Sequence, residues 1–180
     1  MRRSAPFAAT LVTALALAAG CGEDSGGGQS SASEWAESFC TAVTTWTAEL
    51  GKIGDGVGDP SSLSADTLEQ AARDANEASD ELVDEVRSLG TPDVDSGDEV
   101  KASAEGFADS VEAERNKIEE AVGDSSGFSD IAAAVTAIGG SLSAMAGAFR
   151  TTLEEIENAD VAGELESAFE ESSACDGLAS

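Results

Sequence analysis

The sequence of 180 residues contains no histidine and no tyrosine, and aromatic residues make up only 4% of it. Without histidine the chain has no histidine acid–base catalyst, no Ser-His-Asp triad, no zinc-protease motif and no Glu-x-x-His di-iron site. No lysine follows a serine at the three-residue spacing of a Ser-Lys nucleophile, and no glycine-rich phosphate loop occurs. We therefore expect a protein that is not an enzyme and has no cofactor.

Basic residues are also scarce. Nine lysines and arginines stand against 36 aspartates and glutamates, and the formal net charge is −27. A surface this negative repels nucleic acid and anionic lipid headgroups, so we expect no nucleic-acid partner. A basic protein or a cation would be attracted, although an ordinary solvated acidic surface explains the same composition.

The acidic stretch at residues 93–100 is the best candidate for calcium binding. In an EF-hand frame that starts at Asp93, Asp98 stands where glycine is required and Ala104 stands where glutamate is required. Capping of the following helix by Ser96 and Asp98 explains these residues more simply. The sequence therefore predicts no metal site.

The N-terminus has the parts of an export signal. A positive pair, Arg2-Arg3, is followed by an apolar run at residues 5–17 and by small residues that lead to Cys21. The run is shorter than the roughly 20 residues that span a bilayer. An ordinary secretory signal with a chance cysteine remains an alternative, and both Sec and twin-arginine export stay open.

The frame Leu17-Ala-Ala-Gly-Cys21 resembles the lipobox of bacterial prolipoproteins, with Ala18 in place of the commoner leucine. The resemblance implies cleavage between Gly20 and Cys21 after the Cys21 sulfur receives a diacylglycerol, whose two chains suffice for stable anchoring. We then expect a signal peptide at residues 1–20, a flexible Gly/Ser-rich tether at 21–33 and a helical bundle domain at 34–180. The protein would be extracytoplasmic and anchored by lipid to the outer face of the cell membrane.

Beyond the tether, apolar residues recur at helical steps of three and four. The pattern predicts helices near residues 34–53, 66–89, 96–122, 129–157 and, more briefly, 161–173. Capping boxes at Ser31/Glu34 and Ser96/Glu99 mark two of the starts. We predict an all-α fold, an antiparallel up-down-up-down four-helix bundle with a short fifth C-terminal helix.

One residue breaks the stripe of the third helix. Glu114 falls where the next apolar side chain should be. Exposure to solvent on a slightly rotated helix is the simplest interpretation. If the carboxylate is buried it needs a partner, for which Arg115 and Arg150 are candidates.

The two cysteines beyond the tether, Cys40 and Cys175, form an even pair in an exported chain and predict a disulfide, with two free thiols as the alternative. The spacing excludes a Cys-x-x-Cys redox motif. The predicted topology places the end of the fourth helix beside the start of the first, where the fifth segment can bring the cysteines together. By chain entropy such a bridge contributes roughly 5 kcal/mol.

Residues 131–149 contain no charge. Gly140, Ala144 and Ala148 follow one another at a spacing of four and form a smooth candidate interaction face. The segment could be a second membrane span, a helix buried on both sides, or a helix whose outer face meets a partner or a second copy of the chain. Burial inside the domain, under the fifth segment or a neighbour, is the interpretation we prefer from the sequence.

The layout as a whole, with "WAESFCTAVTTW", "LGTPD" and "ACDGL" after the lipobox and tether, resembles small secreted helical lipoproteins of actinobacteria. The resemblance implies a location and a fold but no reaction. We expect a structural or protein-interaction module of the cell envelope, whose partner is an unknown envelope protein or a second copy. The alternative is a carrier of a small apolar ligand, with a pocket between the helices lined by Trp35, Trp46, Phe107 or Met145.

Overall fold

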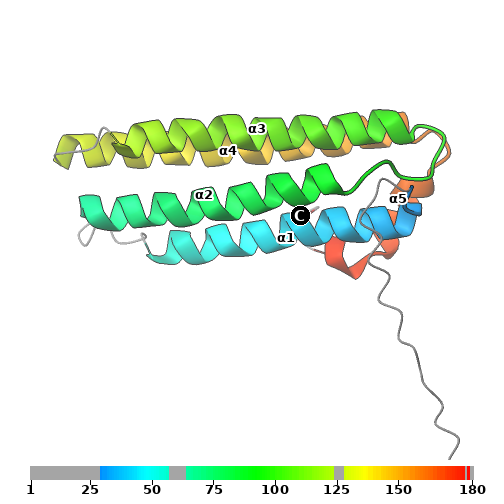
Figure 1. Cartoon of the computed structure of the whole chain (residues 1–180), viewed down its shortest axis with the longest axis horizontal. Coiled ribbons are helices and arrows are strands. Elements are labelled where there is room, and N and C mark those ends of the chain that lie inside the picture. The colour runs from blue at the N-terminus through cyan, green and yellow to red at the C-terminus, as the bar shows by residue number, and fades with distance from the viewer. Residues whose placement is uncertain (1–28, 57–63, 124–127, 177, 179–180) are drawn as a thin grey trace, which may run out of the picture.

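The computed structural model describes residues 29–56, 64–123, 128–176 and 178. Four long helices lie side by side along the long axis of the molecule (Figure 1): α1 (Ala32–Gly56), α2 (Ala65–Ser88), α3 (Gly97–Gly123) and α4 (Phe128–Ala159). Consecutive helices run in opposite directions. A short helix, α5 (Glu164–Glu171), and a 3-10 turn, η1 (Ser173–Cys175), fold back against the N-terminal half of α1. The predicted all-α bundle is confirmed.

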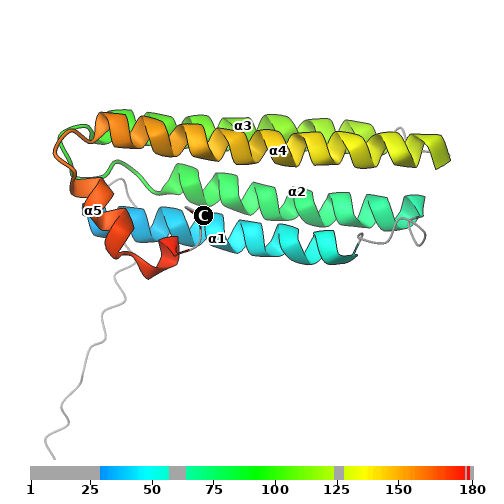
Figure 2. The same ribbon diagram turned by 180° about the vertical axis from the view of Figure 1, so that it is seen from behind.

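The four long helices pack in chain order. Helix α1 packs on α2, α2 packs on α3, and α3 packs on α4 along most of its length. Helices α1 and α4 approach each other much less closely, and in the view of Figure 2 the ribbon of α2 appears between them. In the described part of the chain the bundle is therefore closed on three sides and partly open on the fourth.

An aromatic cluster joins the two halves of the bundle across that open side. Phe39 of α1 is fully buried, and its ring centroid lies 6.4 Å from that of Phe107 on α3, 6.3 Å from that of Phe149 on α4 and 6.3 Å from that of Phe169 on α5. The ring of Trp35 stacks on it at 5.2 Å. Aromatic pairs at these separations add to the stabilisation that burial gives. One side chain of α1 therefore contacts rings on three other helices.

The predicted capping box at the start of α1 is present. The Glu34 backbone N–H donates to the Ser31 hydroxyl over 3.3 Å, and the Ser31 hydroxyl and backbone N–H donate back to the Glu34 carboxylate over 2.8 and 3.2 Å. These hydrogen bonds, the one from the hydroxyl above all, lower the pKa of Glu34. Helix α1 begins at Ala32, two residues before the predicted start.

The fifth helix starts later than the sequence pattern predicts. Asp160 is buried, and its carboxylate accepts the backbone N–H groups of Leu165 over 2.7 Å and of Glu166 over 3.0 Å. This carboxylate cap fixes the helix start, and Gly163 takes the left-handed backbone angle φ 74° that the preceding turn requires. Val161, the first residue of the predicted fifth helix, instead lies in the turn and is 95% exposed.

The prediction for Glu114 was wrong on both counts. Its side chain is only 15% exposed, and its partner is Lys117, one turn further along the same helix, at 2.6 Å. The hydrogen bond from Lys117 lowers the pKa of Glu114 and outweighs the opposing effect of burial, and the Ser141 hydroxyl lowers the pKa further by a smaller amount. Lys117 lies one turn away on the same face of α3, whereas Arg115, the next residue in the chain, points to Asp80 of α2.

We predict that Phe39→Ala lowers the free energy of unfolding by about 3–5 kcal/mol, because it removes a fully buried ring whose neighbours cannot collapse onto the space. Urea denaturation followed by circular dichroism measures this loss. Val161→Ala is the matched control and changes stability by less than about 0.5 kcal/mol. A loss of under about 1 kcal/mol for Phe39→Ala would show that the cluster does not hold the bundle.

Candidate functional site

The uncharged segment of α4 is largely open to solvent. Between residues 131 and 149 only Ala134, Ser141, Met145 and Phe149 are buried. Val135 and Leu142 keep 44% and 38% of their surface exposed. The expectation that this helix is buried on both sides was wrong, because α5 packs mainly on α1 and leaves the outer face of α4 uncovered in the described residues.

Only part of the predicted interaction face is exposed to solvent. Gly140 and Ala144 are exposed, whereas Ala148 is half-buried against the core. A Cβ atom added at Gly139, Gly140 or Gly147 would have no neighbour within 4 Å. The outer side of α4 is thus smooth, uncharged and unobstructed in the described structure.

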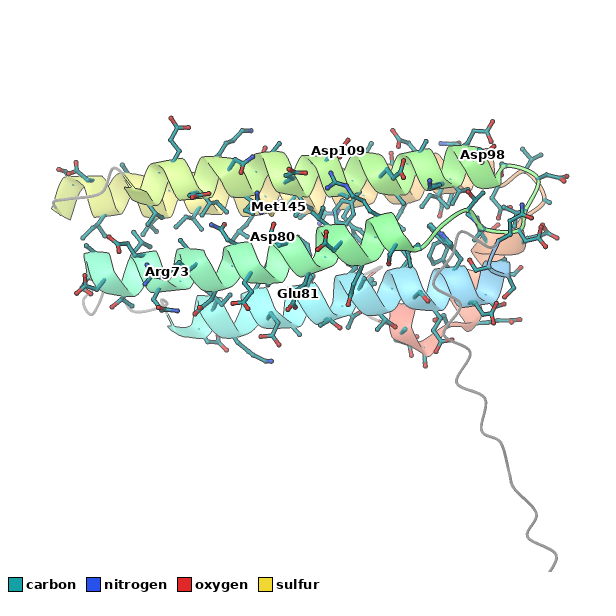
Figure 3. All side chains as sticks on the ribbon, in the orientation of Figure 1. Arg73, Asp80, Glu81, Asp98, Asp109 and Met145 are labelled. Carbon is teal, nitrogen blue, oxygen red and sulfur yellow. A yellow bond between two sulfur atoms is a disulfide. The ribbon has the colours of Figure 1, made fainter. Side chains whose placement is uncertain are left out.

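The span Ser129–Ala159 of α4 is also long and apolar enough to cross a membrane, with a mean hydropathy of 1.6 over its most apolar part. Its inner side carries Met145 and Phe149, which are buried in the common core with α1 and α3. Figure 3 shows Met145 between α4 and the helices below it, while acidic side chains such as Asp109 point outward from the bundle. A membrane span would remove these residues from the core.

A groove of about 830 Å³ lies between α1 and α4. Its floor is apolar and consists of side chains from both helices and from the C-terminal segment: Val43, Trp46, Leu50, Leu142, Phe149, Leu153 and Leu178. The volume is within the range of small-molecule sites, about 300–1,000 Å³. The incomplete packing of α1 against α4 therefore creates a cleft of the size that a ligand needs.

The charged residues of the groove lie toward one end of it. Arg150, Glu154 and Glu157 line the groove on successive turns of α4, and all three are exposed. Arg150 makes no ion pair in the described structure. Each of the other described basic residues pairs with a carboxylate, namely Lys52, Arg73, Arg87, Lys101, Arg115 and Lys117. An unpaired arginine beside an apolar floor is thus specific to this groove.

A smaller cavity of about 80 Å³ adjoins the groove inside the bundle, and Leu50 and Leu142 line both. Two buried polar atoms of residues that line it, Asn76 Oδ1 and Arg115 Nε, have no hydrogen-bond partner in the described residues. Ser79, also on the wall, accepts a hydrogen bond of 3.2 Å from the Trp46 indole. The groove and the cavity therefore share a boundary of two leucine side chains.

The four residues predicted to line a ligand pocket lie in different places: the groove, the inner cavity, a separate cleft and the core. Trp46 lines the groove and Met145 lines the inner cavity. Trp35 instead donates its indole N–H to the Gly90 carbonyl over 3.2 Å and touches a separate cleft beside α2. Phe107 is buried in the aromatic cluster. None of these cavities therefore contains two of the four, although the rings of Trp46 and Phe107 lie 6.2 Å apart in the core.

Sequence reasoning missed the side chains that open the groove. Leu142 and Leu153 lie on the apolar stripe of the predicted helix at residues 129–157, which is typical of core residues, yet Leu142 is exposed. Arg150 was considered only as a partner for Glu114. The signal that marks it is its position as the one basic residue in α4.

A disulfide joins Cys40 of α1 to Cys175 of η1, the pairing that the sequence predicts. Beside it the Thr44 hydroxyl donates to the Ala174 carbonyl over 2.9 Å. These links fix the C-terminal segment on α1 and bring Leu178 to the groove. Gly20 and Cys21, the predicted cleavage and lipidation residues, lie outside the described residues.

No known protein family, characterised protein or solved structure matches the chain. Within the described ranges, no group of three or more cysteine, aspartate or glutamate side chains is placed to hold a metal ion. The argument for function therefore rests on the groove, the outer face of α4 and the N-terminal sequence.

We predict that replacing both Cys40 and Cys175 by serine lowers the free energy of unfolding by about 2–5 kcal/mol, because the bridge closes a long loop in the unfolded chain. Thermal denaturation with and without a reducing agent measures the effect. The reductant should lower the melting temperature of the native chain and leave that of the double variant unchanged. Equal melting temperatures for the native chain in both buffers would contradict the prediction.

Proposed function

We propose that the chain is a lipid-anchored, extracytoplasmic protein of the cell envelope that binds another protein through the outer face of α4. The N-terminal sequence supports the anchor, since an export signal ends at Cys21 in the frame of a lipobox. The Cys40–Cys175 disulfide supports an oxidising location. Helix α1 begins next to the tether, so the end of the bundle that carries α5 would lie nearest to the membrane.

The exposed, uncharged face of α4 carries the proposal of protein binding. In a chain with a net charge of −27, the nineteen residues from 131 to 149 have no charge and expose most of their outer side chains. Monomeric soluble proteins rarely expose large contiguous apolar patches, and the centres of protein interfaces are depleted of charge. Exposed glycine and alanine, such as Gly140 and Ala144, also let a partner approach the helix backbone closely.

A second candidate function is favoured by the groove between α1 and α4. Its volume of about 830 Å³ and its apolar floor are typical of small-ligand sites. Trp46 in the floor and Met145 in the adjoining cavity are two of the residues that the sequence suggests for such a pocket. The chain would then carry an apolar or amphipathic ligand at the membrane surface.

We predict that Cys21→Ala moves the protein from the membrane fraction to the soluble extracytoplasmic fraction of the native host, because it removes the site of acylation. Fractionation shows the location, and mass spectrometry of the native protein should find a diacylglyceryl group on an N-terminal Cys21. Ser25→Ala, in the same tether, is the control and stays at the membrane. An unmodified thiol at Cys21 in the native protein would refute the anchor.

We predict that a photoreactive amino acid at Ala144 gives a discrete cross-linked product in the native envelope, whereas the same amino acid at Glu81, exposed on α2, gives none. The reason is that the α4 face around Ala144 lacks charge, whereas Glu81 on α2 lies among other acidic residues. Mass spectrometry then distinguishes a second copy of the chain from another protein. The same cross-linking pattern at both positions would show that α4 is no specific interface.

A further inference from the structure

We propose that the groove between α1 and α4 binds a single-chain zwitterionic amphiphile, with its anionic group at Arg150 and its cationic group beyond it. The inference sharpens the carrier function suggested above and rests on it. It is independent of lipid on Cys21 and of a protein partner on α4. It follows from the order in which apolar, basic and acidic side chains occur along the groove.

The end of the groove away from α5 suits a hydrocarbon tail. From Leu142 to Arg150 the α4 wall covers about 12 Å of helix axis, and the facing wall is built by Trp46 and Leu50. Half of a bilayer's hydrocarbon core, the room that one acyl chain fills, is about 15 Å. The inner cavity adjoins this end at Leu50 and Leu142 and extends the apolar volume.

The middle of the groove suits an anion. Arg150 is the one described basic residue without an ion pair, although the chain has 36 acidic residues. A phosphate or carboxylate accepts two parallel hydrogen bonds from a guanidinium, and such charge-assisted bonds are stronger than neutral ones. An uncharged apolar ligand would leave this arginine unpaired.

The end of the groove near α5 suits a cation. Glu154 and Glu157 line it on the turns that follow Arg150. The adjoining cleft, of about 280 Å³, is lined by Glu157 again and by Glu166 and Glu170 of α5. A purely anionic headgroup would meet these carboxylates without compensation. An ammonium beyond the anionic group would be attracted to them, as in a single-chain phospholipid with a phosphate followed by an amine.

The order of groups is thus tail, anion and cation on the ligand, and apolar floor, Arg150 and glutamates on the protein. A second copy of the chain fits the groove less well, because two copies with a charge of −27 each repel one another. A partner helix would not need this order of charges.

The test uses dodecylphosphocholine below the concentration at which it forms micelles. The chain from Cys21 onward, with Cys21→Ser, is suitable because every residue of the core cluster lies between Ala32 and Leu178. We expect saturable binding by calorimetry, with amide NMR shifts confined to residues 43–51 and 142–157. Glycerophosphocholine, which has no tail, should not bind. Dodecanol and laurate should bind at least about threefold more weakly than the zwitterion.

Charge variants test the head-group order. Arg150→Gln should weaken dodecylphosphocholine about three- to tenfold, in the range of one charge-assisted contact. Arg73→Gln on α2 is the matched control, with no effect. Glu157→Gln should weaken dodecylphosphocholine but strengthen laurate, since it removes an attraction in one case and a repulsion in the other. A merely structural role for Glu157 would move both affinities in the same direction.

A blocking variant tests the place of binding. Gly51 lines the groove, and a Cβ atom there would have no neighbour within 4 Å, so Gly51→Leu should fold and fill the cleft. It should weaken binding more than tenfold, whereas Gly106→Leu, on the exposed side of α3, should not. Equal affinity for dodecanol and the zwitterion, or no effect of Arg150→Gln, would overturn the inference and leave the carrier function. No binding of any of these ligands would overturn both.

Discussion

The contact of the Phe39 ring with rings on α3, α4 and α5 is the interaction on which the structure depends. Helices α1 and α4 do not pack closely on one another along their length. The contact between the rings of Phe39 and Phe149 is what joins them. Phe39 provides this link and lies one residue before the disulfide cysteine Cys40. The covalent and the aromatic links therefore fasten the same end of the bundle, next to the tether. The groove begins beside these links, at Phe149 and Leu178, and runs along the open side toward Leu50 and Leu142.

This asymmetry gives α4 three different surfaces. Its inner side is core, with Met145 and Phe149. The side toward α1 is the floor of a groove whose charges are restricted to one end. Its outer side is smooth and has no charge, in a protein that is otherwise strongly acidic. Both proposed functions use this one helix, because it is the only long helix of the bundle that combines a charge-free stretch of this length with an exposed face.

Much of the fold could be predicted from the sequence, because periodicity, capping boxes and breaks are local signals. The exposure of the outer face of α4 could not be predicted, because an apolar composition shows that a helix can be buried but not whether another element covers it. The ion pair of Glu114 with Lys117 and the capping of α5 by Asp160 each depend on one carboxylate. A sequence pattern does not distinguish these two carboxylates from the many other acidic residues of the chain. The groove could not be predicted because its residues, such as Leu142, have the same helical spacing and apolar character as the residues of the core.

The most direct test of this account is the solvent exposure of methyl groups on α4 in the free, monomeric chain, measured by NMR with a soluble paramagnetic relaxation agent. The account predicts that the methyl groups of Leu142, Ala144 and Ala146 relax much faster than the protected methyl group of Met145, although more slowly than those of the fully exposed Val161. If Leu142 and Ala146 were as protected as Met145, the bundle would be closed on all four sides. Neither the groove nor the open face of α4 would then exist in solution.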